Sequence, residues 1–211
     1  MKHVVLLGDS IFDNKAYVGA GPDVIEQLRA DLPPGWVATL GAIDGATTVD
    51  VKRQLAELPD GVTHLVVSAG GNDALGHEDL LEEKASSVAQ VLDKLAKIRA
   101  SFEETYIAML DDVTGTGLPV AVCSIYESNY EDADTRRIAN TALTLFNDVV
   151  TREVFRRGLR LIDLRLIFDS PADYANAIEP SVKGGAKLAR VLAQVVTTHD
   201  FKQKQSVVYA G

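Results

Sequence analysis

The chain begins MKHVVLLGDS, in which the apolar run Val4–Leu7 stops at Gly8-Asp9-Ser10. Consecutive apolar residues without polar alternation are typical of strands buried on both faces of a parallel sheet. The runs LVV at 65–67 and VAV at 120–122 share this pattern, and helical segments separate the runs. Five such strands alternating with helices predict an α/β fold, a three-layer sandwich around a five-stranded parallel sheet.

The apolar spacing places the expected elements along the chain. The expected strands are Val4–Leu7, Trp36–Leu40, Val62–Ser68, Pro119–Ile125 and Leu159–Leu164. The expected helices are Asp23–Leu32, Thr48–Leu58, Leu80–Leu110 (as one helix or two), Ala133–Arg157 and Gly184–Thr198. No repeat or linker interrupts this pattern, so residues 1–200 are predicted to form a single domain. Residues 201–211 form a C-terminal tail, for which a loose end, an added strand and an oligomer contact are all open.

Composition excludes several classes of protein. The 211 residues include 21 Lys and Arg against 30 Asp and Glu, a net charge of −9, which argues against nucleic acid or a membrane surface as a partner. A single cysteine excludes a disulfide framework, and no spacing indicates a metal site, so we expect no metal and no cofactor. No apolar stretch approaches the ~18–20 residues of a membrane span, and we expect a cytoplasmic protein.

Three polar turns follow the first three expected strands. They are Gly8-Asp9-Ser10, the stretch IDGATT at 43–48, and Gly70-Gly71-Asn72-Asp73. Each alone is most simply a turn, because Gly, Asn, Asp and Ser suit turn conformations. The carboxyl ends of parallel strands share one edge of a sheet, however, so the three turns are expected to meet there.

Acyl transfer is a chemistry that these turns could share. Ser10, at a strand-to-loop turn, is placed as a nucleophile. Gly45 has no Cβ, so its backbone N–H can approach a ligand closely, and the Asn72 side chain offers another N–H. With the Ser10 N–H these donors would form an oxyanion hole, in which losing one donor typically costs ~3–4 kcal/mol of barrier height.

Three motifs resemble, in their order and spacing, the first three sequence blocks of the SGNH (GDSL) hydrolase family. They are GDS at 8–10, IDGATT at 43–48 and GGND at 70–73. The resemblance spans essentially the whole chain. It implies a flavodoxin-like sandwich with strand order 2-1-3-4-5 and esterase, lipase or thioesterase activity on a small-molecule ester or thioester. It also implies that Ser10 is the nucleophile and that Gly45 and Asn72 complete the oxyanion hole.

The fourth block departs from the family pattern. The family has Asp-x-x-His-Pro before the last helix, whereas this chain has Asn176-Ala-Ile-Glu179-Pro180. We therefore expect Glu179 to be the general base and the Asn176 amide to orient it by donating a hydrogen bond. Glu has a reference pKa of ~4.3 against ~6.5 for His, which makes it roughly 100-fold weaker as a base unless burial raises that pKa.

Two alternatives concern the missing histidine. A lost general base can cost 10²–10⁴-fold in rate, so the chain is alternatively a catalytically impaired binding protein on the same fold. His77, five residues after Asn72, is an alternative base, although a solvated or capping histidine is the simpler interpretation.

The remaining polar candidates lie around the expected site. Tyr126 and Tyr130, in the loop after the fourth strand, either line a substrate pocket or serve as surface turn residues. Asp9 and Asp73 are expected to stabilise their own turns. Asp173 either orients Glu179 or is an exposed loop carboxylate.

Overall fold

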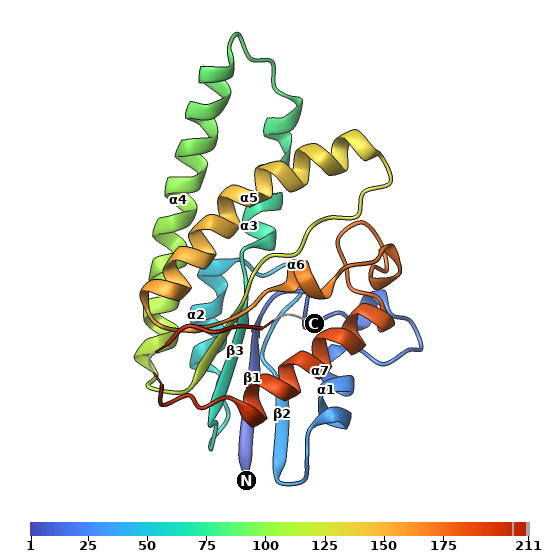
Figure 1. The fold of residues 1–211 in the computed structure, drawn as a ribbon, viewed down its shortest axis with the longest axis vertical. Helices are drawn as coiled ribbons and strands as arrows, with labels where there is room; N and C mark the ends of the chain where they lie inside the picture. The colour runs from blue at the N-terminus through green and yellow to red at the C-terminus, as the bar shows by residue number, and fades with distance from the viewer. Residues whose placement is uncertain (204, 210–211) are drawn as a thin grey trace.

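A parallel sheet forms the middle layer of the protein (Figure 1). The computed structural model describes residues 1–203 and 205–209, and within them the sheet has six strands. In sheet order these are β2 (Trp36–Leu40), β1 (Lys2–Gly8), β3 (His64–Ser68), β4 (Val120–Cys123), β5 (Arg160–Ile162) and β6 (Val208–Tyr209). The predicted order 2-1-3-4-5 and the α/β class are confirmed.

The prediction of five strands is wrong by one. The sixth, β6, comes from the C-terminal tail and pairs in parallel with β5. The backbone N–H groups of Leu161 and Asp163 donate to the carbonyls of Val207 and Tyr209, at 2.9 and 2.8 Å. Strand β5 would otherwise present an unpaired edge, and the tail covers it. A strand of two residues has too little periodicity to be seen in the sequence. The domain boundary at residue 200 stays a prediction.

Helices cover both faces of the sheet, so the fold has three layers. Val4 and Leu6 of β1 pack with α1 and α7 on one face, and Val5 and Leu7 pack with α2, α4 and α5 on the other. These alternating buried positions explain why the stretch Val4–Leu7 of β1 contains no polar residue. The α-helices are α1 (Val24–Asp31), α2 (Val51–Ala56), α3 (Gly71–Leu75), α4 (Val88–Gly115), α5 (Ala133–Arg156), α6 (Leu164–Ile167) and α7 (Val182–Thr198). The short 3₁₀ turns are η1 (Lys15–Tyr17), η2 (Thr48–Asp50), η3 (Glu78–Glu82) and η4 (Pro171–Asp173).

The segment predicted as one long helix or two divides into η3 and α4. Helix α4 begins after Ser87, whose side chain accepts a hydrogen bond from the backbone N–H of Gln90 at 3.1 Å. A serine in this capping position satisfies one of the free N–H groups of a helix start. The first half of α4 and the connection from η3 rise beyond α5 as an arm, at the top of Figure 1. No helix in the described ranges is both long and apolar enough to cross a bilayer.

The strand order reverses at β1, between β2 and β3, and ligands bind parallel sheets at such a point. Gly8 ends β1 with φ +129°, and a Cβ there would lie 1.6 Å from the carbonyl oxygen of Ser68. Only glycine permits this approach. The ends of β1 and β3 are therefore close enough for the turns that follow them to share a site.

Candidate active site

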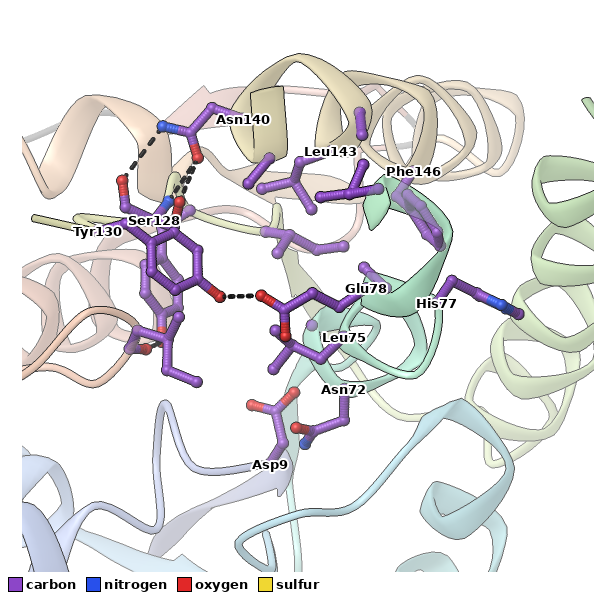
Figure 2. A pocket seen from close by; sticks show the side chains of 18 of the residues that line it. Asp9, Asn72, Leu75, His77, Glu78, Ser128, Tyr130, Asn140, Leu143 and Phe146 are labelled. Carbon is purple, nitrogen blue, oxygen red and sulfur yellow. Dashed lines mark hydrogen bonds between the residues drawn. The ribbon is translucent and has the colours of Figure 1, made fainter. Parts of the chain in front are cut away.

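A cleft opens at the carboxyl ends of β1 and β3. The empty space in and in front of this cleft, including the part open to solvent, is about 1050 Å³. Ser10, Asn72 and Glu179 line it. Figure 2 shows Asp9 and Asn72 at its base, with Leu143 and Phe146 of α5 above them. Residues from widely separated parts of the chain thus face one space.

Ser10 and Glu179 meet directly in this cleft. The Ser10 Oγ donates a hydrogen bond to Glu179 Oε1 at 3.0 Å, across 169 positions of sequence. Both residues are buried, with 8% and 5% of their surface exposed. A general base must lie about 2.6–3.2 Å from the proton it removes, and Glu179 meets this requirement.

A tight hairpin of residues 174–180 presents Glu179. Tyr174 pairs with Pro180 in an antiparallel bridge, and the Ala175 N–H donates to the Glu179 carbonyl at 2.7 Å. The Asn14 side chain ties this hairpin to the loop after β1, because its Nδ2 donates to the Pro180 carbonyl at 3.2 Å. Its Oδ1 accepts from the Val24 N–H at 3.0 Å. Sequence reasoning missed Asn14, because a buried asparagine cannot be told from a turn asparagine by spacing.

Asn176 does not contact the Glu179 carboxylate in the way that was predicted. Its Oδ1 accepts hydrogen bonds from the backbone N–H groups of Ile178 and Glu179, at 2.9 and 2.8 Å. This is the local turn bonding that asparagine commonly makes. Asn176 therefore orients Glu179 through the backbone of the hairpin. Among residues 1–203 and 205–209, the second carboxylate oxygen, Oε2, is buried without a hydrogen-bond partner.

Burial raises the pKa of two carboxyls that line the cleft. It raises the pKa of Glu179 from 4.5 to about 7, opposed by the hydrogen bond from Ser10. It also raises the pKa of Asp9 from 3.8 to about 7, opposed by the N–H of Ile11. A carboxylate with few partners is costly in a low-dielectric site, so its proton is held more tightly. Glu179 is thus brought close to the basicity of an ordinary histidine.

The three expected oxyanion donors lie at the same sheet edge. Asn72 Nδ2 donates to the carbonyl of Ala46 at 2.9 Å, which leaves its second hydrogen available and holds the Gly45 loop beside β3. Gly45 has φ +79°, a left-handed conformation that favours glycine. In the part of the chain that the structure describes, the N–H groups of Ser10 and Gly45 donate to no protein acceptor.

The acidic residues of the turns connect the loops. Asp73 of α3 accepts from the N–H and Oγ1 of Thr48, at 3.0 and 2.7 Å, and so joins α3 to the loop after β2, where η2 begins. Asp13 accepts from the N–H of Asp44 at 2.9 Å, which joins the loop after β1 to the same loop. Asp73 was expected to stabilise its own turn, but its carboxylate instead bonds to Thr48 in a neighbouring segment.

The buried side chain of Gln54 also supports the site, and sequence reasoning missed it. It bonds to the N–H and the carbonyl of Gly8, both at 2.8 Å. Because Gly8 ends β1, this pair of bonds fixes the strand end from which Ser10 projects.

The histidine candidate turns its ring away from the site, whereas the two tyrosine candidates line the cleft. His77 lies at the edge of the cleft, and its ring points away from Asp9 and Asn72, toward α4 (Figure 2). Tyr126 and Tyr130 both line the cleft. The Tyr126 hydroxyl donates to the Ile178 carbonyl, and the Tyr130 hydroxyl donates to Glu78 Oε1 at 2.8 Å.

Asp173 is neither an exposed loop residue nor a partner of Glu179. It is fully buried, and its Oδ2 pairs with Lys187 Nζ at 2.6 Å. The pair ties η4 to helix α7, so Asp173 supports the start of the hairpin from behind.

A family model described as GDSL-like lipase/acylhydrolase matches residues 6–187. A search of curated proteins finds no significant match.

Three solved structures with the same fold are a lipase, a lipase/acylhydrolase and an acetyl xylan esterase. An extracellular lipase from Streptomyces rimosus is 20% identical with a TM-score of 0.68, over 94% of this chain and 100% of that one. A lipase/acylhydrolase from Enterococcus faecalis is 18% identical with a TM-score of 0.64, over 93% and 95%. An acetyl xylan esterase from Geobacillus stearothermophilus is 18% identical with a TM-score of 0.59, over 94% and 95%.

These identities establish the fold alone, whereas the family model covers most of the chain. The matched segment runs from β1, which precedes Ser10, to the start of α7, which follows Glu179. The chain belongs to the GDSL-like lipase/acylhydrolase family.

Proposed function

We propose that the protein is a serine ester hydrolase that acts on small acyl esters, with Ser10 as nucleophile and Glu179 as general base. The observation that carries the proposal is the 3.0 Å hydrogen bond from Ser10 Oγ to Glu179 Oε1 inside the cleft. A nucleophile within hydrogen-bond reach of a base is the arrangement that covalent catalysis requires.

The proposed reaction has two steps. Ser10 Oγ attacks the ester carbonyl carbon and passes its proton to Glu179, while the carbonyl oxygen becomes an anion held by the N–H groups of Ser10, Gly45 and Asn72. The carbon–oxygen bond to the alcohol then breaks, and the alcohol leaves with the proton from Glu179. A water molecule attacks the acyl-Ser10 ester, gives its proton to Glu179, and releases the acid while Ser10 regains a proton.

The raised pKa of Glu179 supports a base of useful strength. At pH 7 a carboxyl with a pKa of about 7 is about half ionised, so both the accepting and the donating forms are present. When protonated, Glu179 is neutral and not a cation, so it needs no neighbouring carboxylate to stabilise it. This accounts for an asparagine, and not an aspartate, at position 176.

The test is hydrolysis of p-nitrophenyl acetate and of a matching acetyl thioester by the wild type and by Ser10→Ala, Glu179→Gln and His77→Ala. We expect Ser10→Ala to abolish turnover, Glu179→Gln to lower kcat by about 10²–10⁴-fold, and His77→Ala to match the wild type. Turnover that persists in Ser10→Ala would overturn the proposal. A wild type without Ser10-dependent turnover would instead favour a binding protein on this fold.

A further inference from the structure

The cleft extends well beyond Ser10, and its extension is apolar. On one side it is walled by residues of α5, on the other by α3, η3 and α4. The apolar side chains that line it are Ala74, Leu75, Leu80, Leu81, Leu95, Ile98, Ile125, Ala139, Ala142, Leu143, Phe146 and Ile178. Such a surface favours the apolar part of a ligand, because each buried methylene is stabilised by about 0.8 kcal/mol, a factor of about four in binding.

The polar side chains of the extension are already paired within the protein. Tyr130 donates to Glu78, as Figure 2 shows, and the N–H and Oγ of Ser128 both donate to Asn140 Oδ1, at 2.8 and 2.7 Å. The Asn140 amide donates in turn to the Ser128 carbonyl at 3.1 Å. A carbohydrate or another polyhydroxylated group would therefore find few unpaired partners here.

Charge also limits what this space can hold. In the described ranges, the carboxyl and histidine side chains that line the cleft are Asp9, Glu78, Glu179 and His77, and no Lys or Arg lines it. An anionic group in the extension would therefore meet carboxylates without a compensating cation, which is unfavourable in a partly buried site.

Two residues of α4, Leu95 and Ile98, line the cleft. Leu92, Val91 and Val88 continue the same helical spacing outward along the arm, where they are exposed and lie outside the cleft lining. Along α5, the lining from Ala139 to Phe146 covers about 10 Å, which matches an extended alkyl chain of about eight carbons.

We propose that this extension is the acyl-chain site and that the enzyme prefers esters of medium-length fatty acids, of about eight carbons, over acetyl esters. The inference rests on the proposed function, since it assigns the acyl side of the same serine site. It separates this chain from an enzyme specific for acetyl groups, for which a long apolar extension would have no use.

The test is the acyl-chain profile of kcat/KM for p-nitrophenyl esters from acetyl to decanoyl. We expect kcat/KM to rise by up to about fourfold for each methylene that enters the extension, and to level off near eight carbons. Ala142→Trp fills the extension from α5, and Leu143→Ala enlarges it. Ala108→Trp, at an exposed position on α4 outside the cleft, is the matched control.

Ala142→Trp should lose the preference for octanoyl over acetyl esters, and Leu143→Ala should move the optimum to a longer chain. Ala108→Trp should keep the wild-type profile. A wild type that hydrolyses acetyl esters through Ser10 but slows with chain length would refute the acyl-chain site and leave the proposed function intact. The same conclusion would follow if Ala142→Trp kept the wild-type profile.

A second measurement keeps the inference testable if no ester is hydrolysed. Calorimetry on Ser10→Ala compares the binding of octanoyl and acetyl esters of one alcohol. Tighter octanoyl binding that is lost in Ser10→Ala/Ala142→Trp supports the acyl-chain site in a protein that does not hydrolyse. Equal binding of the two esters would overturn it.

Discussion

Replacing Glu179 with Gln should make the protein less active and more stable at the same time. Glutamine has the shape of the protonated carboxyl and can accept the hydrogen bond from Ser10, but it cannot ionise. In the native protein, burial raises the pKa of Glu179 from 4.5 to about 7. The native state therefore holds this proton more tightly than the unfolded chain does, and ionisation at neutral pH works against folding.

The magnitude follows from this pKa difference. A rise of the Glu179 pKa from 4.5 to about 7 on folding corresponds to up to about 3 kcal/mol of unfolding free energy. The sign is opposite to that of a salt-bridged carboxylate: the contribution of Glu179 is favourable at low pH, and it is lost as pH rises from about 4.5 to about 7. Above pH 7 the loss is complete. Glu179→Gln should then exceed the wild type by up to about 3 kcal/mol at pH 8 and by close to nothing at pH 4.5.

Urea denaturation of the two proteins at several pH values between 4.5 and 8 measures this difference. The matched control is Glu104→Gln, an exposed glutamate on α4, which should follow the wild type at every pH. The pH profile of kcat/KM provides a second readout, because an ionised base is needed: wild-type activity should fall as pH drops below about 7. If the stability difference between Glu179→Gln and wild type is the same at pH 4.5 and pH 8, the carboxylate is not destabilised by burial and the reasoning fails.

Two further predictions concern residues away from the reacting atoms. Asn176→Ala should remove both acceptor bonds of the hairpin and lower kcat/KM by about 5–30-fold, the equivalent of about 1–2 kcal/mol. Asn176→Asp should restore most of the activity, because it keeps the acceptor oxygen. It should also move the acid limb of the pH profile to higher pH, because it adds a negative charge. Failure of this rescue in steady-state kinetics would argue against a positioning role. Burial beside Trp36 lowers the pKa of His64 from 6.5 to about 4, so its neutral form favours the native state and that stability is lost as pH falls from about 6.5 to about 4. In His64→Gln, the free energy of unfolding should fall by up to about 3 kcal/mol less between pH 6.5 and pH 4 than in the wild type. Denaturant titrations at several pH values measure this difference, and the same pH dependence in both proteins would contradict the assignment.

Apolar runs and the turns after them predicted a parallel sheet with Ser10, Gly45 and Asn72 at one edge, because strand ends can be located from such runs. The order of the strands came from the resemblance to the SGNH (GDSL) family. The position of Glu179 followed from its register against Pro180 and the last helix. These features depend on local patterns whose spatial consequence is fixed by the parallel topology.

What could not be predicted depends on contacts between distant segments. Gln54 holds Gly8 across 46 positions, and Asn14 holds Pro180 across 166. Neither residue differs from an ordinary polar residue in its local sequence. Asn176 shows the same limit in another form: its position was predicted, but whether its amide faces a carboxylate or a backbone turn depends on the conformation of the hairpin.

In the proposed mechanism Glu179 stands where the family pattern has a histidine, and it would acquire its strength as a base in a different way. An imidazole becomes a cation when it takes the serine proton, and a hydrogen-bonded aspartate stabilises that cation. A carboxylate becomes neutral, so a nearby donor would stabilise its ionised form and make it a weaker base. The structure leaves Oε2 of Glu179 buried without a partner in the described ranges and turns the Asn176 amide toward the backbone. The basicity of Glu179 therefore rests on its burial and on the lack of a protein donor to Oε2 among the described residues, and a substrate that closes the cleft with an apolar chain would increase it further.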